Sequence, residues 1–185
     1  MPVKDFSLSL AARALDAGGV IAYPTEGVFG LGCRVDCLPA VRRVIALKRR
    51  APNKGLIVIV AGIEDALPFI HAPERWLPEA VSQGFGEAPV TCVFPVLAGV
   101  SALLTGGRAS IALRVVQHPL AAELCRRCGP LVSTSANASG APAARTGLEV
   151  RLRFGSRLDW IVNRPVGGLG RPTALYDVEK QRRLR

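Results

Sequence analysis

Apolar and polar positions along the chain alternate between a helical spacing and short continuous apolar runs. In 6–17, four apolar residues recur at helical spacing, and Gly18-Gly19 ends the pattern. The run 56–60, Leu-Ile-Val-Ile-Val, is the most continuous of the apolar segments bounded by turn residues, which indicate buried strands. The pattern predicts helices over 6–17, 38–48, 63–70, 72–83, 119–128 and 148–154, a helical turn over 101–104, and strands over 20–23, 56–60, 90–94, 110–116, 131–132, 159–162 and 174–176.

This alternation of helix and strand predicts an α/β fold in one domain that spans residues 1–185. A chain of 185 residues fits one domain, and a hydrophobic fraction of 49% can supply its core. There is no internal repeat, low-complexity tract or break in composition to mark a domain boundary. The pattern does not give the order of the strands in the sheet.

Residues 130–140, Pro-Leu-Val-Ser-Thr-Ser-Ala-Asn-Ala-Ser-Gly, change abruptly from apolar to polar. Five of the seven positions 133–139 carry a hydroxyl or amide side chain. The change predicts a buried strand that ends at Val132 and delivers a loop of hydrogen-bonding groups. Such loops often serve only as turns and helix caps. The density of polar side chains favours a ligand-binding loop, because ligands in α/β sheets lie beyond the carboxyl ends of strands.

The charge of the chain is strongly positive. Twenty-four Lys and Arg residues against 14 Asp and Glu give a formal net charge of +10, partly clustered at 42–43, 48–50 and 180–185. This charge makes a polyanion such as nucleic acid a plausible partner. No apolar run approaches the ~20 residues of a membrane span, and the first residues lack the apolar core of a signal peptide. We therefore expect a cytoplasmic protein without membrane contact.

The five cysteines and two histidines offer little for catalysis. Cys33-x3-Cys37 and Cys125-x2-Cys128 resemble zinc-ligand pairs, but both lie in apolar or helical patterns, which favours reduced, buried thiols over a metal site. The histidines, His71 and His118, each lie within two residues of a proline. We expect neither histidine to act as a catalytic base.

Known phosphate-binding and nucleophile motifs are absent, but cations and glycines remain. The sequence contains neither a G-x4-G-K-[ST] loop nor a G-x-S-x-G elbow. Lys48 is the last residue of a predicted helix, and Arg50 and Lys54 follow it; cations at the end of a helix are also a common surface feature. Arg114 lies within an apolar strand, so it is either half of an internal ion pair or a binder of carboxylate or phosphate. Cations and oriented donors can bind a triphosphate, and transfer between bound substrates suits a site without an obvious nucleophile.

Several segments together resemble the successive motifs of the YrdC-like family, the threonylcarbamoyl-AMP synthases. The segments are Tyr-Pro-Thr-Glu-Gly-Val-Phe-Gly-Leu-Gly at 23–32, Lys-Arg-Arg at 48–50, Lys-Gly-Leu-Ile at 54–57, Ile-Ala-Leu-Arg-Val at 111–115, His-Pro at 118–119 and Ser-Thr-Ser-Ala-Asn-Ala-Ser-Gly at 133–140. Their order and spacing fit from about residue 7 to 177. In length the chain is similar to the short bacterial form.

The resemblance implies a fold, a reaction and partners. The fold is a twisted, mostly parallel or mixed sheet flanked by helices, with a basic concave surface. The reaction forms threonylcarbamoyl-adenylate and pyrophosphate from L-threonine, bicarbonate and ATP. Magnesium accompanies the ATP, and no tightly bound metal is expected. Partner proteins then transfer the threonylcarbamoyl group to the adenosine beside the anticodon of tRNA.

The resemblance also implies which residues form the site. Lys48, Arg50, Ser135 and Asn137 match the family's catalytic set. The residues matching ATP contacts are Lys48, Arg50, Lys54, Ser110, Ser135 and Asn137. The residues matching threonine contacts are Thr25, Arg114, Thr134 and Thr173. A threonine site with polar groups should reject substrates that lack the hydroxyl, because its own groups would be left unpaired.

The chain departs from the family pattern at two places. Gly-Phe-Gly-Glu-Ala-Pro at 84–89 stands where Trp-Pro-Gly-Pro is usual, and Pro172-Thr173 replaces the usual Pro-Ser. The first change bears on one wall of the pocket, and the second keeps a hydroxyl. The alternative function is a non-catalytic RNA-binding module on the same basic concave surface, against which an aromatic content of only 5% counts. A zinc-stabilised structural protein is a weaker alternative.

Overall fold

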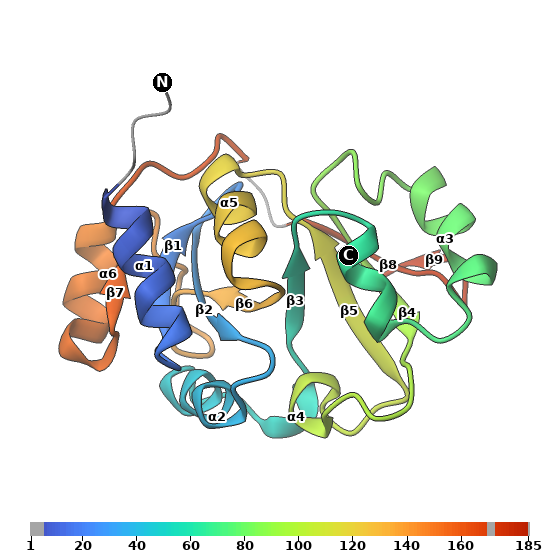
Figure 1. Ribbon diagram of the computed structural model, residues 1–185, viewed down its shortest axis with the longest axis horizontal. Helices are drawn as coiled ribbons and strands as arrows, with labels where there is room; N and C mark the ends of the chain where they lie inside the picture. The colour runs from blue at the N-terminus through green and yellow to red at the C-terminus, as the bar shows by residue number, and fades with distance from the viewer. Residues whose placement is uncertain (1–5, 170–172, 185) are drawn as a thin grey trace.

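Strands from all parts of the chain form one sheet in the computed structural model, which describes residues 6–169 and 173–184 (Figure 1). Within these residues the sheet has nine strands, in the order β7-β1-β2-β6-β3-β5-β4-β8-β9. Their bounds are β1 Ile21–Pro24, β2 Phe29–Arg34, β3 Ile57–Val60, β4 Val90–Pro95, β5 Ser110–Val115, β6 Leu131–Ser135, β7 Trp160–Ile161, β8 Ala174–Asp177 and β9 Arg182–Arg183. Pro172, part of a departure from the family pattern, and Arg185, the last residue of the basic cluster 180–185, lie outside the described residues.

The sheet is mixed, as the resemblance implied, but it is not mostly parallel. Among the described strands, five pairings are antiparallel and three, β1–β7, β3–β5 and β4–β8, are parallel. Connection length explains part of this difference. Only residues 25–28 separate β1 from β2, and a parallel pair needs a crossover of a dozen or more residues. In addition, β6 lies between β2 and β3 and runs antiparallel to both.

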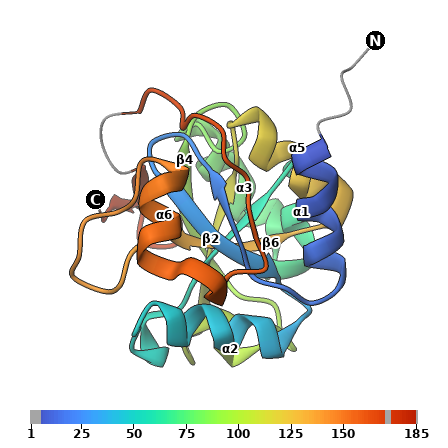
Figure 2. The ribbon, with the colours of Figure 1, turned by 90° about the vertical axis from the view of Figure 1, so that its left-hand side faces the viewer.

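Helices cover both faces of the sheet. They are α1 Phe6–Asp16, α2 Leu38–Leu47, α3 Pro73–Ser82, α4 Ala102–Thr105, α5 Pro119–Cys128 and α6 Gly147–Phe154, with 3-10 segments η1 Pro52–Lys54, η2 Glu64–Phe69 and η3 Gly155–Arg157. Figure 2 shows α1 and α5 on one side of the β1-β2-β6 region and α6 on the other. No helix among the described residues has the length and apolarity to cross a membrane.

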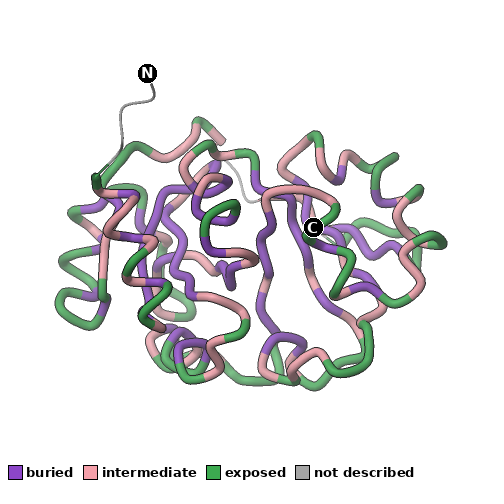
Figure 3. Tube along the Cα trace, viewed as in Figure 1, coloured by how far each residue is buried: buried purple, intermediate pink, exposed green. Residues whose placement is uncertain are grey.

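Two hydrophobic clusters follow this arrangement. One joins α1 and α5 to side chains such as Tyr23, Ile59 and Leu131, and the other packs the remaining helices against the opposite face. Figure 3 shows the buried residues concentrated along the strands. On the first face, however, α1 and α5 leave part of the sheet uncovered, since Ile57 and Ala112 are only half-buried. This open part of the sheet is where a ligand can reach the strands.

Two glycines in β2, Gly30 and Gly32, let the side chain of Tyr23 lie close to that strand. A Cβ at Gly32 would lie 2.2 Å from the Val132 carbonyl oxygen and 2.7 Å from the Tyr23 hydroxyl. A Cβ at Gly30 would lie 3.2–3.3 Å from side-chain atoms of Thr25, Ser133 and Tyr23. The alternation of glycine with bulky residues in 28–32 therefore serves close packing against a neighbouring side chain.

Most predicted elements are confirmed, with two corrections. The strand predicted to end at Val132 continues to Ser135, because Leu131–Ser135 pairs with β2 along its whole length, and with β3 as far as Ser133. Ser133, Thr134 and Ser135 are therefore strand residues and not a loop. The helix predicted over 63–70 is the 3-10 segment η2, in which Pro68 has no N–H to donate to the preceding turn.

Candidate functional site

A cavity of about 580 Å³ opens on the uncovered part of the sheet. Its wall combines the turn after β1, the start of β2, the end of β6, one residue each of β3 and β5, and the segment before α6. The residues that line it are Thr25, Glu26, Gly27, Val28, Phe29, Gly30, Arg50, Ile57, Arg114, Ser133, Thr134, Ser135, Pro142, Ala143, Arg145, Leu169 and Thr173. Three of these are arginines, so the cavity is suited to anionic groups.

Lys48 connects α2 to the end of β6. It follows the last residue of α2, is only 3% exposed, and directs its ammonium group toward β6. Nζ donates to the Ser135 carbonyl oxygen at 2.6 Å, to Ser135 Oγ at 3.3 Å and to Asn137 Oδ1 at 2.5 Å. Ser135 Oγ also donates to Asn137 Oδ1 at 2.7 Å. An ammonium group has three hydrogens, so these neutral acceptors use all of them.

Burial makes Lys48 easier to deprotonate than an ordinary lysine. Desolvation lowers its pKa to about 8, and repulsion by Arg50 contributes in the same direction. The predicted surface role for cations at this helix end therefore does not apply to Lys48. An anion brought near this ammonium group would stabilise its charged form.

Arg50 lies at the cavity wall and shapes the basic loop. Arg49, between the two cations, adopts a φ of 47°, which turns the chain sharply after α2. Arg50 Nε donates to the Gly55 carbonyl oxygen at 2.9 Å, and Nη2 donates to that of Lys54 at 3.2 Å. Burial, followed by repulsion from Arg108, lowers the pKa of Arg50 from its usual value. The loop 51–55 is thus held by the same guanidinium that faces the cavity.

The turn after β1 is fixed by short hydrogen bonds. Thr25 donates to the Val28 carbonyl oxygen from its hydroxyl at 2.8 Å and from its backbone N–H at 3.0 Å. Gly167 N donates to the Thr25 carbonyl oxygen and Leu169 N to that of Glu26, both at 2.9 Å. A Cβ on Gly167 would lie 2.6 Å from the Glu26 carbonyl oxygen. The absence of a side chain at 167 lets this segment lie directly across the turn.

Arg114 and Glu26 form a buried pair at the cavity. The Arg114 side chain is 9% exposed and the Glu26 side chain 8%, with Nη2 and Oε2 3.8 Å apart. Arg114 Nη1 donates to Thr173 Oγ1 at 3.2 Å, and Thr173 lies 3.4 Å from the hydroxyl of the buried Thr91. The interpretation of Arg114 as half of an internal ion pair is therefore confirmed. Because Arg114 also lines the cavity, its binding of a carboxylate or phosphate stays a prediction.

The structure brings most of the predicted site residues together. Thr25, Arg50, Arg114, Thr134, Ser135 and Thr173 line the cavity, and Lys48 and Asn137 are hydrogen-bonded to Ser135. Strand alternation directs the Thr134 side chain to the face opposite Ser135, so its backbone is the part available at the cavity. Ser110 shares a face with Arg114 in β5 but lies four residues away, roughly 13 Å along the strand. Lys54 is exposed and contacts Arg50 through its carbonyl group.

Two charged lining residues, Glu26 and Arg145, were not predicted. Glu26 lies inside the Pro-Thr-Glu segment, and the requirement of a buried Arg114 for an anionic partner could have identified it. Arg145 has no comparable signal, because it reaches the cavity only through the path of the chain between β6 and α6. Ser139 donates from its backbone and its hydroxyl to the Lys48 carbonyl oxygen, which indicates a structural role.

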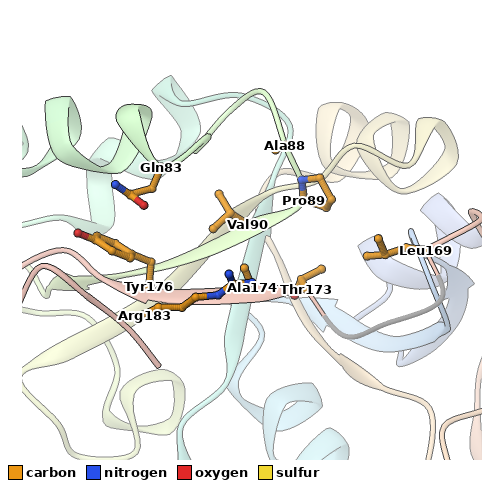
Figure 4. A pocket seen from close by; sticks show the side chains of 9 residues that line it. All are labelled: Gln83, Ala88, Pro89, Val90, Leu169, Thr173, Ala174, Tyr176 and Arg183. Atoms are coloured by element: carbon orange, nitrogen blue, oxygen red, sulfur yellow. The ribbon is translucent and has the colours of Figure 1, made fainter. Parts of the chain in front are cut away.

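The segment 84–89, which lacks the usual Trp-Pro-Gly-Pro, lies beside a second, smaller cavity. Phe85 is fully buried and packs edge-on against Phe94, with ring centroids 5.2 Å apart. Figure 4 shows this cavity of about 260 Å³, to which Ala88 and Pro89 contribute. Leu169 and Thr173 line both cavities. The altered segment therefore reaches the edge of the candidate site through Leu169 and Thr173.

The cysteines and histidines lie outside the main cavity. All five cysteines are free thiols, and burial raises the pKa of both Cys33 and Cys92 to about 12. In the described part of the chain, no group of three or more His, Cys, Asp or Glu residues could hold a metal ion. His118 precedes α5 at its N-cap position, and His71 is exposed.

Comparisons with known proteins show which proteins this chain is similar to. Residues 13–185 match the Sua5/YciO/YrdC family model, whose description is "Telomere recombination". The threonylcarbamoyl-AMP synthase of Idiomarina loihiensis is 45% identical over 169 residues, which cover 90% of this chain and 91% of that protein. The enzyme of the same name from Methylococcus capsulatus is 42% identical over 184 residues, 99% of this chain and 98% of that protein.

Solved structures show the same fold. The crystal structure of P. abyssi Sua5 complexed with L-threonine has a TM-score of 0.87 and 27% identity, and the match covers 97% of this chain and 53% of that one. This chain thus spans about half the length of the P. abyssi protein. E. coli YciO has a TM-score of 0.78 at 22% identity, covering 92% of this chain and 82% of that one, which is a likeness of fold.

Proposed function

This chain belongs to the Sua5/YciO/YrdC family, and from that premise we propose that it is a threonylcarbamoyl-AMP synthase. Such an enzyme converts L-threonine, bicarbonate and ATP into threonylcarbamoyl-adenylate and pyrophosphate, and is a nucleotidyltransferase. One observation carries the proposal. A single cavity is lined by two groups of residues. Arg114, Thr25 and Thr173 are suited to bind an amino acid, and Arg50 and Ser135 are suited to bind a phosphate chain.

In this proposal, threonine lies at the Arg114 end of the cavity. The guanidinium binds the substrate carboxylate, because its planar fork matches that group. The hydroxyls of Thr25 and Thr173 lie in the same wall and are suited to the polar groups of threonine. The backbone of Thr134 contributes to this wall.

The triphosphate extends toward Arg50 and the end of β6. Arg50 neutralises charge that develops on the leaving pyrophosphate, since it lines the cavity and keeps its charge. The Lys48 ammonium group is hydrogen-bonded to Ser135 and Asn137 in the free protein. When ATP binds, the ammonium group exchanges at least one of these three neutral acceptors for an anionic oxygen. Lys54 and Ser110 extend the ATP contacts along the basic loop and the start of β5.

The reaction depends on positioning of the two substrates and does not require covalent catalysis by a side chain. The amine of threonine first combines with bicarbonate to give a carbamate and water. A carbamate oxygen then attacks the α-phosphorus of ATP, and the bond from that phosphorus to the bridging oxygen breaks to release pyrophosphate. Holding both substrates in one cavity makes the attack effectively unimolecular. Magnesium would enter with ATP as part of the substrate, where it would offset charge on the phosphate oxygens.

The product is a mixed anhydride of a carbamate and a phosphate. It is activated for attack on its carbonyl carbon, so we propose that tRNA-modification proteins consume it by transfer of the threonylcarbamoyl group to adenosine in tRNA. The RNA-binding alternative uses the same cations without catalysis. It is less well supported, since Arg114 is buried within a cavity sized for small molecules.

Pyrophosphate release tests the proposal. We expect release by the purified protein only when ATP, threonine and bicarbonate are all present. Arg50→Gln should lower kcat/KM for ATP at least 30-fold, and Arg114→Gln should lower kcat/KM for threonine at least 30-fold. Arg127→Gln, which alters an exposed arginine paired with Glu123 on α5, is the matched control and should retain wild-type activity. Salt-sensitive RNA binding without pyrophosphate release would instead support the alternative.

A further inference from the structure

Glu26 is a buried carboxylate that the proposed reaction does not use. One of its oxygens, Oε1, accepts a hydrogen bond from the Gln117 backbone N–H at 2.8 Å. The other, Oε2, is buried without a hydrogen-bond partner among the described residues, and its nearest cation is Arg114 Nη2 at 3.8 Å. A carboxylate oxygen in this state is costly, so its retention calls for a reason beyond packing.

Arg114 is under-satisfied in the same way. Its guanidinium carries five donor hydrogens, but in the described structure Nη1 has one hydrogen bond, to Thr173, and the buried Nε has none. The separation of 3.8 Å from Glu26 is too long for a hydrogen bond. Arg114 therefore keeps donors for a further acceptor while a fixed negative charge stands beside it.

The backbone explains why the pair does not close. Glu26 is held from two sides, by Gln117 N at its Oε1 and by Leu169 N at its carbonyl oxygen. Its carboxylate is thus anchored to the backbone two residues beyond β5 and cannot follow the guanidinium. A fixed anion at this position attracts the guanidinium to one place at the wall without occupying its donors.

We propose that Glu26 is a positioning residue that orients the Arg114 guanidinium for an anionic group of the substrate, the threonine carboxylate. The inference rests on the proposed function. Without the charge of Glu26, the cation has a single side-chain hydrogen bond, to Thr173, and turns among several orientations. Binding must then select one of them, which weakens affinity for threonine and leaves the ATP end unaffected.

Glu26→Gln tests this role, because the amide oxygen still accepts from Gln117 N while the charge is removed. We expect the KM for threonine to rise about tenfold, with kcat within threefold of wild type and the KM for ATP unchanged. Glu26→Asp, which restores the charge, should recover part of the affinity. Glu123→Gln removes the same charge from the surface of α5 and should change neither KM.

A double variant separates positioning from a structural role. If Glu26 acts only through Arg114, Glu26→Gln added to Arg114→Gln leaves the KM for threonine at the value of Arg114→Gln alone. An unchanged or lower threonine KM in Glu26→Gln, or additive effects in the double variant, would overturn the positioning role. If the wild-type protein released no pyrophosphate in response to threonine, the proposed function itself would be overturned. The failure of the positioning role and the failure of the proposed function are therefore distinguishable.

Discussion

The lowered pKa of Lys48 predicts that nucleotide affinity depends on pH in the weakly alkaline range. Its ammonium group has a pKa of about 8 because it is buried, with a smaller contribution from Arg50. A lysine is charged below its pKa, so the free protein loses this positive charge as the pH rises through 8. Bound phosphate stabilises the charged form, so the protein must take up a proton to bind ATP above that pH.

The size of the effect follows from the protonated fraction. A pKa of about 8 leaves about 90% of Lys48 charged at pH 7 and about 10% at pH 9. If only the charged form binds well, the dissociation constant for nucleotide rises about tenfold between these values. An ordinary lysine, with a pKa near 10.4, would change by less than about 10% over the same range.

Calorimetric titration with a non-hydrolysable ATP analogue, without threonine, measures this dependence directly. Lys48→Met keeps most of the apolar stem and removes the charge. We expect its affinity to be weak and nearly independent of pH, and to approach that of the wild type at pH 9. Circular dichroism at each pH checks that both proteins stay folded. A flat wild-type profile, or an equal slope in Lys48→Met, would refute the argument.

Three further predictions concern the stability of the fold and the role of the Ser139 hydroxyl. Gly32→Ala should lower the free energy of unfolding in urea by about 1–3 kcal/mol, because its Cβ would lie 2.2 Å from the Val132 carbonyl oxygen, while Gly168→Ala, whose Cβ meets nothing within 4 Å, should change little. Burial raises the pKa of Cys33 to about 12, so above pH ~8.5 the folded state keeps a proton that the unfolded state loses. The free energy of unfolding should therefore fall as the pH rises from about 8.5 toward 12, and this thiol should account for about 2 kcal/mol of that fall at pH 10. In Cys33→Ala the free energy of unfolding should fall less steeply with pH. Ser139→Ala should cost about 1 kcal/mol of stability but leave the ATP KM within twofold, because its hydroxyl serves only the Lys48 carbonyl oxygen; a large KM change would assign it to the site.

The sequence by itself determined the local elements and the types of chemistry. Helical spacing and apolar runs located the helices and seven of the nine strands of the described residues, because each depends on residues close together in the chain; β2 and β9 were not predicted. It also identified Arg114 as a cation in need of an anion, and the resemblance of several motifs in register identified the family. These conclusions rest on side-chain type and short-range spacing, which the chain carries before it folds.

Tertiary structure decided everything that depends on distant partners. The strand continues through Ser135 because it pairs with β2, and with β3 as far as Ser133. These partners are distant in the chain, so the local pattern could not distinguish its polar residues from a loop. The low pKa of Lys48 arises from burial against Ser135 and Asn137, which are 87 and 89 positions away in the chain. The partner of Arg114 is Glu26, 88 positions earlier in the chain. Burial and electrostatic interactions depend on distances in space, and only the packed sheet sets those distances.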